Sequence, residues 1–238
     1  MNSFTINDLS AGYGSKTILS DINADIPAGN TTAITGCNAC GKTTLLKCMA
    51  NIIRPRSGAC LLDGIPLDRY KNKTLAEKIS YCPQDHPDCS YLNVKELISI
   101  GRYPCSSNTD SAVEDAMKLA GVTEYADMKL GELSGGTQHR VWLALALARQ
   151  PEILLLDEPS NFLDPAQKQL LADLLNRLKT ERGITVVMVT HDLELISNAA
   201  DFVLALKDGR IIKKGTSGIM RDPEVLQEIY SIIPCSGC

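Results

Sequence analysis

The sequence lacks an apolar run long enough to cross a membrane. Its longest such run, from Val141 to Ala148, ends at Arg149, whereas a transmembrane helix needs roughly 18 or more apolar residues. A basic excess is also missing, because 24 Lys and Arg against 28 Asp and Glu give a net charge of −4. That balance predicts neither nucleic-acid binding nor a cationic face for an acidic membrane. The first residues lack the charged-then-apolar layout of a signal peptide, so we expect an intracellular, soluble chain.

Internal repeats and low-complexity tracts are likewise missing from the 238 residues. Hydrophobic residues make up 44% and charged residues 22% of the chain, which is ordinary for a soluble globular protein. This length allows one large domain or two small ones, with a sizeable core in either case.

Residues 36–43 read Gly-Cys-Asn-Ala-Cys-Gly-Lys-Thr and match G-x-x-x-x-G-K-[ST], the phosphate-binding P-loop. The β-branched segment 31–35 predicts a buried strand before the loop. Residues 44–50 contain no Gly or Pro and predict a helix after it. Strand, glycine loop and helix are the context that the motif requires. The alternative, a chance match in a glycine-rich turn, does not account for the later motifs.

The chemistry of this loop follows from its backbone. Glycines allow the N–H groups to turn inward around a phosphate, and the helix directs its positive dipole end at the same group. Lys42 can reach the β- and γ-phosphates of a nucleotide, and the Thr43 hydroxyl can ligate Mg²⁺. We therefore expect the phosphates to be bound by Gly36, Cys37, Asn38, Ala39, Cys40, Gly41, Lys42, Thr43 and Thr44.

Two further strands end in polar residues. Asp157 and Glu158 follow the apolar segment 153–156, and ligands of α/β sheets bind at such carboxyl ends. Asp157 can hold Mg²⁺ directly or through water, and Glu158 can polarise a water that attacks the γ-phosphate. His191 follows segment 184–190 and could hydrogen-bond a phosphate oxygen or that water. The alternatives are a solvated strand end for the carboxylates and simple exposure for the histidine.

Ser134, Gly135 and Gly136 open the predicted helix 135–149. A serine and two glycines at a helix N-terminus can bind an anion through the hydroxyl, the free N–H groups and the dipole. A plain N-cap is the alternative.

Nine cysteines are present, an odd number that suits a reducing compartment. Two pairs, Cys37/Cys40 and Cys235/Cys238, have the C-x-x-C spacing of a metal half-site or a redox pair. A metal on the first pair would block the phosphate loop. We therefore expect both pairs to be reduced thiols that serve as small apolar residues.

The remaining patterns predict an α/β fold. Residues 4–9 and 18–26 indicate a pair of β-strands ahead of the P-loop, with a turn at 12–14, and residues 94–149 are dominated by helix signals. The Leu-Ala alternation from Val141 to Ala148 could belong to a strand, but both residues are strong helix formers. Strands and helices then alternate, ending in a predicted hairpin at 202–212. The other segments predicted are strands 59–62, 79–82, 153–156 and 184–190, and helices 74–78, 94–100, 111–120 and 165–182.

In chain order, these motifs resemble those of the ATP-binding subunit of an ABC transporter. The match runs from Tyr13 to Gly215 and comprises the P-loop, Gln84, Leu133-Ser134-Gly135-Gly136, Leu156-Asp157-Glu158-Pro159, Leu163-Asp164 and His191. The resemblance implies a P-loop NTPase (RecA-like) core with an N-terminal antiparallel β subdomain and an inserted α-helical subdomain. It implies one domain over 1–238, with the core in 1–86 and 151–238 and the helical part in 87–150.

The same resemblance implies roles for single residues. Two subunits would form a head-to-tail homodimer that encloses two ATP molecules, each bound by one P-loop and by the partner's Ser134, Gly135 and Gly136. Tyr13 would stack on adenine, and Asp164 would lie in the loop that crosses the dimer. Glu158 would be the general base, His191 the switch, Lys42 a catalytic cation, and Thr43, Gln84 and Asp157 would hold Mg²⁺.

Gly101-Arg102-Tyr103-Pro104 resembles the subgroup that imports iron–siderophore, haem or cobalamin. That implies two copies on integral-membrane permease subunits, at the inner face of the cell membrane, with an external binding protein delivering substrate. The alternatives are a non-transport ATPase of the Fe–S assembly type and an exporter ATPase. Ala39, Thr137 and the pair Gln138-His139 depart from the usual motifs. None of them removes a catalytic group, so we expect effects on rate and nucleotide affinity alone.

Overall fold

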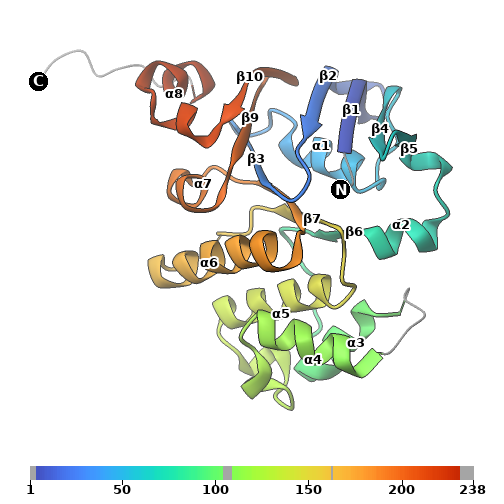
Figure 1. Cartoon of the computed structure of the whole chain (residues 1–238), viewed down its shortest axis with the longest axis vertical. Helices are drawn as coiled ribbons and strands as arrows, with labels where there is room; N and C mark the ends of the chain where they lie inside the picture. Colours follow the sequence, from blue (N-terminus) through green and yellow to red (C-terminus); the bar gives the residue numbers. More distant parts are fainter. Residues whose placement is uncertain (1–3, 104–108, 162, 231–238) are drawn as a thin grey trace, which may run out of the picture.

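The computed structural model describes residues 4–103, 109–161 and 163–230 (Figure 1). The predicted fraying of 234–238 and the pair Cys235/Cys238 lie outside the described residues. Within these ranges, no helix is both long and apolar enough to cross a bilayer.

The larger sheet has six strands in the order β10-β9-β3-β8-β7-β6. Neighbouring strands from β9 to β6 are parallel, and β9 and β10 form the antiparallel hairpin that the sequence predicted. The strands are β3 (Thr31–Gly36), β6 (Ile79–Cys82), β7 (Ile153–Asp157), β8 (Thr185–Val189), β9 (Phe202–Lys207) and β10 (Arg210–Thr216). Their order places the carboxyl ends of β3, β8 and β7 side by side.

The smaller sheet is antiparallel throughout, in the order β2-β1-β4-β5, and confirms the predicted N-terminal β subdomain. The turn predicted at 12–14 lies further along, at Gly14 and Ser15, because Gly12 and Tyr13 pair with Thr17 and Lys16 in the ladder. Gly14, at φ 52, takes up the reversal with Ser15 and so lets both strands continue. The strands are β1 (Phe4–Tyr13), β2 (Lys16–Ile26), β4 (Ser57–Leu62) and β5 (Ile65–Pro66).

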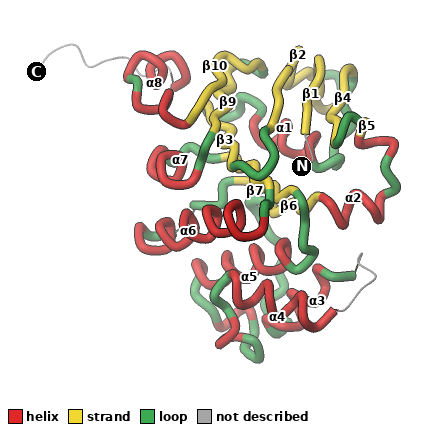
Figure 2. Tube along the Cα trace, in the orientation of Figure 1, coloured by secondary structure: helices red, strands yellow, loops and turns green. Residues whose placement is uncertain are grey.

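The helices include all those that the sequence predicted and two that it did not, α7 and α8. Three of them, α3, α4 and α5, pack together at one end of the molecule (Figures 1 and 2). The helices are α1 (Lys42–Met49), α2 (Asn72–Lys78), α3 (Val94–Gly101), α4 (Thr109–Leu119), α5 (Gly135–Leu147), α6 (Pro165–Arg182), α7 (Leu193–Ala199) and α8 (Pro223–Tyr230). Short 3₁₀ turns are η1 (Leu67–Arg69), η2 (Thr123–Tyr125), η3 (Leu130–Glu132) and η4 (Ser217–Arg221).

Both faces of the larger sheet are buried, each by its own apolar cluster. Successive residues of β3 divide between them, with Ala33 in the cluster that contains α3–α6 and Ile34 in the cluster that contains β1, β2 and α1. Leu154 and Leu155 of β7 divide in the same way. Burial on both faces explains why these strands read as continuous apolar runs.

Helix ends place several of the predicted site residues. Ser134 caps α5, and its side chain accepts a hydrogen bond from the Thr137 N–H at 3.3 Å. Asp164 caps α6 in a capping box with Gln167, Pro165 occupies the first turn, and Gly183 ends the helix at φ 65. These are the signals expected of helix termini.

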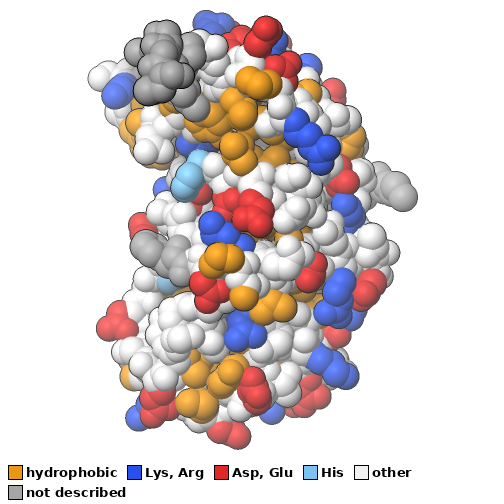
Figure 3. All heavy atoms as spheres, turned by 90° about the vertical axis from the view of Figure 1, so that its left-hand side faces the viewer, with side chains coloured by type: hydrophobic (Ala, Val, Ile, Leu, Met, Phe, Trp, Pro, Cys, Tyr) orange, Lys and Arg blue, Asp and Glu red, His pale blue; other side chains and the backbone are white. Residues whose placement is uncertain are grey.

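On the face drawn in Figure 3, acidic and basic side chains are interspersed, in keeping with the small net charge of −4.

Candidate active site

The P-loop joins β3 to α1, and its geometry requires glycine at both ends. Gly36 has φ 148 and Gly41 has φ 106. A Cβ on Gly36 would collide with the Leu206 carbonyl oxygen, and one on Gly41 would lie 2.7 Å from Leu19 Cδ2. Ala39 adopts φ 61, a left-handed conformation that costs a non-glycine residue roughly 1–2 kcal/mol. Glycine would adopt this conformation without that cost.

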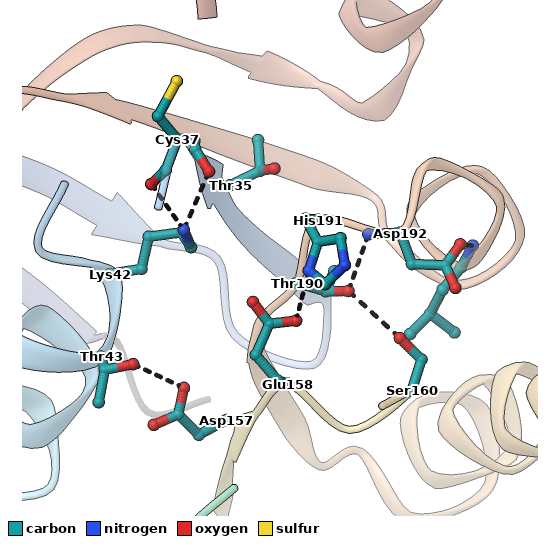
Figure 4. Close-up of polar contacts among 12 residues, drawn as sticks. Thr35, Cys37, Lys42, Thr43, Asp157, Glu158, Ser160, Thr190, His191 and Asp192 are labelled. Atoms are coloured by element: carbon teal, nitrogen blue, oxygen red, sulfur yellow. Dashed lines mark hydrogen bonds and ion pairs between the residues drawn. The ribbon is translucent and has the colours of Figure 1, made fainter. Parts of the chain in front are cut away.

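The N-terminus of α1 has no side-chain cap. Its N-cap, Gly41, makes no side-chain capping hydrogen bond, so its first N–H groups suit an anion. The Lys42 side chain, only 7% exposed, points back into the loop. Its Nζ donates to the carbonyl oxygens of Gly36 and Cys37, both at 2.9 Å (Figure 4).

Asp157 lies beside α1 at the end of β7. Its Oδ1 accepts a hydrogen bond from Thr43 Oγ1 at 3.0 Å, and its Oδ2 accepts one from the Tyr81 hydroxyl at 3.1 Å. Burial raises the pKa of Asp157, while the two hydroxyl donors and nearby lysines act in the opposite direction. A carboxylate next to a threonine hydroxyl is an oxygen ligand set that suits Mg²⁺. The residues present therefore fit the ion that the sequence predicted here.

Glu158 follows directly in a left-handed conformation, at φ 49. Its N–H donates to the Val189 carbonyl of β8, which ties the residue to the neighbouring strand. His191, just beyond β8, places Nδ1 3.0 Å from Glu158 Oε2, and the two side chains face each other in Figure 4. The glutamate side chain is 12% exposed and the histidine side chain 59%. The structure thus brings together the two polar residues predicted at this sheet edge.

Gln84 and Glu158 line one cavity of about 370 Å³, together with residues at the start of α5. In its wall the rings of His86 and Trp142 stack, with centroids 4.4 Å apart and planes at 7°. Burial is the main cause that lowers the pKa of His86 to about 4, so its ring is neutral at pH 7. Sequence reasoning missed His86, Trp142 and Tyr81, because no local motif marks partners that meet only through the fold.

The Ser134 motif lies on α5, apart from α1 (Figure 1). Ser134 and Gly135 are exposed, whereas Gly136 is buried. A Cβ on Gly136 would collide with the side-chain amide of Gln167, so the Gln167 side chain reaches from α6 to the first turn of α5. Tyr13, at the end of β1, is 52% exposed.

The described cysteines form no evident metal site. The Cys37 thiol donates to the Ile229 carbonyl at 3.1 Å, and burial raises the pKa of the Cys40 thiol. Within the described ranges no group of three His, Cys, Asp or Glu side chains could hold a metal ion.

We therefore expect protein purified without an affinity metal to contain no stoichiometric zinc, measured by elemental mass spectrometry. Zinc that disappears when Cys235 and Cys238 are both replaced by serine would contradict this prediction and place a metal on the C-terminal pair.

Known proteins resemble this chain over nearly its whole length. A protein-family model described as "ABC transporter" matches residues 19–161. The iron(3+)-hydroxamate import ATP-binding protein FhuC of Bacillus subtilis (strain 168) is 38% identical over 239 residues, covering 98% of this chain and 89% of that protein. The ferric enterobactin transport ATP-binding protein FepC of Escherichia coli (strain K12) is 35% identical, covering 94% of this chain and 85% of that protein.

Solved structures agree with this result. The cassette MJ0796, described as a bacterial ABC transporter cassette in a dimeric structure, is 27% identical, with a TM-score of 0.79 over 90% of this chain and 98% of that chain. A second structure of MJ0796 is a dimer in a post-hydrolysis state bound to ADP and Pi, with the same TM-score of 0.79, identity of 27% and coverage of 90% and 98%.

Proposed function

Because this chain belongs to the ABC transporter family of ATP-binding proteins, we propose that it hydrolyses ATP to power an importer of iron–siderophore type substrates. The observation that carries the ATPase activity is the convergence of Lys42, Asp157 and Glu158 at the carboxyl ends of β3 and β7, the two strands that flank β8. The near-full-length identity to relatives named for iron-hydroxamate import and ferric enterobactin transport supports the substrate class.

The P-loop residues 36–44 bind the nucleotide phosphates through backbone N–H groups at the uncapped end of α1. Lys42 leaves the carbonyls of Gly36 and Cys37 and donates to the β- and γ-phosphates. Thr43, Gln84 and Asp157 hold Mg²⁺, which, when bound, neutralises phosphate charge. The hydrogen bond from Thr43 to Asp157 supports this assignment, because it already brings two oxygen ligands together.

Glu158 accepts the proton of the attacking water. His191 orients the Glu158 carboxylate. The 3.0 Å contact between His191 Nδ1 and Glu158 Oε2 supports the pairing. A general base must be held within hydrogen-bond reach of the proton that it accepts. The bond from the Glu158 N–H to β8 fixes the backbone from which the carboxylate projects. Gln84, which lines the same cavity as Glu158, would supply its side-chain amide to the metal and the water.

Two copies form a head-to-tail homodimer in which each nucleotide is enclosed by both subunits. Ser134, Gly135 and Gly136 of one subunit contact the γ-phosphate bound by the other, Asp164 crosses between them, and Tyr13 stacks on adenine. Exposure of Ser134, Gly135 and Tyr13 leaves these residues available to a ligand. The dimeric structure of MJ0796 supports the assembly.

The chain acts as a single ATP-binding domain at the inner face of the cell membrane. Its helical part, 87–150, and the segment Gly101-Arg102-Tyr103, of which Tyr103 is exposed, receive the integral-membrane permease, which an external binding protein supplies with substrate. Tyr103 is 93% exposed and Ile100 55% exposed, which suits a docking role for this segment. The net charge of −4 supports the absence of a nucleic-acid partner.

We predict that the tagged chain, recovered from detergent-solubilised membranes, brings with it a permease of many spans. Tyr103→Ala should reduce that recovery, because it removes an exposed aromatic side chain from the docking segment. Ile65→Ala, which removes an exposed side chain from β5 in the smaller sheet, is the control and should not change it. Recovery of soluble Fe–S assembly proteins without a permease would contradict the proposal.

A further inference from the structure

The C-terminal end of α8 is hydrogen-bonded to the start of the P-loop. The Tyr230 hydroxyl shares a hydrogen bond of 2.7 Å with Thr35 Oγ1, one residue before Gly36. One residue after Gly36, the Cys37 thiol donates to the carbonyl oxygen of Ile229 at 3.1 Å. Ile229 itself is fully buried. Two contacts from one helix therefore flank the first glycine of the loop.

Other contacts hold α8 in place. Lys207 Nζ, at the end of β9, donates to the Glu228 carbonyl at 2.9 Å, and Lys213 of β10 forms an ion pair with the Glu228 side chain at 3.4 Å. Lys207 and Cys37 thus donate to two successive backbone carbonyls, those of Glu228 and Ile229, in the last described turn of α8. Because β9 neighbours β3 in the larger sheet, α8 is fixed to the same frame that carries the P-loop.

The contacts with α8 lie on the side of the loop that faces away from the Lys42 amine. In Figure 4 the Cys37 sulfur points away from the Lys42 amine. Lys42 holds the loop from within, through the carbonyls of Gly36 and Cys37. When this lysine turns to phosphate, both carbonyls lose their donor. The bonds to Tyr230 and Ile229 do not involve Lys42, so we expect them to remain when nucleotide binds.

We propose that α8 holds the P-loop in its phosphate-binding shape, and that Tyr230 is a positioning residue for nucleotide binding through Thr35. The inference rests on the nucleotide binding proposed above. Thr35 is fully buried and Tyr230 is half-buried, so water replaces their bond poorly when it is lost. Burial raises the pKa of Tyr230, which keeps the hydroxyl protonated. A loop that is already shaped for its ligand loses less entropy on binding.

The test is Tyr230→Phe, which removes the hydroxyl and keeps the ring. We expect the affinity for Mg-ATP, measured by titration calorimetry, to fall by about 3- to 10-fold, the usual effect of one hydrogen bond. The matched control is Tyr70→Phe, which removes another tyrosine hydroxyl bond, that to the Leu62 carbonyl at 2.8 Å. Both variants should lower the Tm of the nucleotide-free protein slightly, but only Tyr230→Phe should weaken binding.

A second variant tests the same bond from the other side. Thr35→Val should weaken binding as much as Tyr230→Phe does, and the double variant should bind no more weakly than either, because the two residues act through one contact. Cys37→Ala should also weaken binding, and Cys37→Ser, which retains a donor, should restore part of the loss.

The outcomes separate two failures. If the parent protein and Tyr70→Phe do not bind Mg-ATP, the proposed function is wrong. If both bind it, and Tyr230→Phe and Thr35→Val bind equally tightly, the positioning role of α8 is overturned while the ATPase proposal stands.

Discussion

Glu158→Gln is expected to lower ATP turnover by about 10²- to 10⁴-fold, the usual contribution of general-base catalysis. The amide keeps the shape of the carboxylate but cannot accept the proton of the attacking water. Lys42, Thr43 and Asp157 are unchanged, so Mg-ATP should still bind, the pattern expected when only the transition state loses stabilisation. Turnover is measured by phosphate release, and binding by titration calorimetry.

With hydrolysis blocked, the ATP-bound dimer of Glu158→Gln should accumulate and be visible by size-exclusion chromatography with ATP and Mg²⁺. Glu181→Gln is the control, because Glu181 is an exposed residue of α6 paired with Arg177. Turnover of Glu158→Gln at the parent rate would show that Glu158 is not the base. If neither Glu158→Gln nor the parent protein forms a dimer with ATP, the measurement is repeated on the complex with the permease.

Lys42→Ala is expected to weaken Mg-ATP binding by about 10- to 100-fold, the effect of losing a hydrogen bond from a charged donor. The change removes the ammonium that lies inside the loop and leaves the carbonyls of Gly36 and Cys37 without this donor. With nucleotide bound weakly, the protein should remain monomeric under conditions in which Glu158→Gln forms dimers.

Lys73→Ala is the control for Lys42→Ala, because it removes an exposed lysine from another helix, α2. Circular dichroism of each variant shows whether the fold is retained. A folded Lys42→Ala protein that binds Mg-ATP as tightly as the parent would contradict the role given to Lys42.

Local sequence signals were enough to predict most of the fold. The Leu-Ala alternation within α5 was assigned to a helix on propensity, and the structure confirms it. The two missed helices had usable signals as well. Asp192 caps α7, and Asp222 stands before Pro223 at the start of α8, accepting from the Glu224 N–H. These cap residues were present in the sequence but were not interpreted as helix starts.

Contacts between distant segments could not be predicted in the same way. The carboxyl ends of parallel strands meet at one sheet edge, and this general rule was enough to place Asp157, Glu158 and His191 together. No such rule brings Tyr230 to Thr35, or His86 to Trp142. The left-handed backbone of Glu158 was also beyond prediction, because a glutamate carries no preference for that conformation.

The division of β3 between the two apolar clusters has a consequence for hydrogen exchange. Because Ala33 and Ile34 are fully buried on opposite faces of the sheet, the amides of this strand exchange with solvent only when both clusters open, which amounts to global unfolding. A ligand that binds only the native protein raises the free energy of that opening by RT ln(1 + [L]/Kd). Nucleotide held by the P-loop therefore slows exchange throughout both clusters, in segments that never touch it.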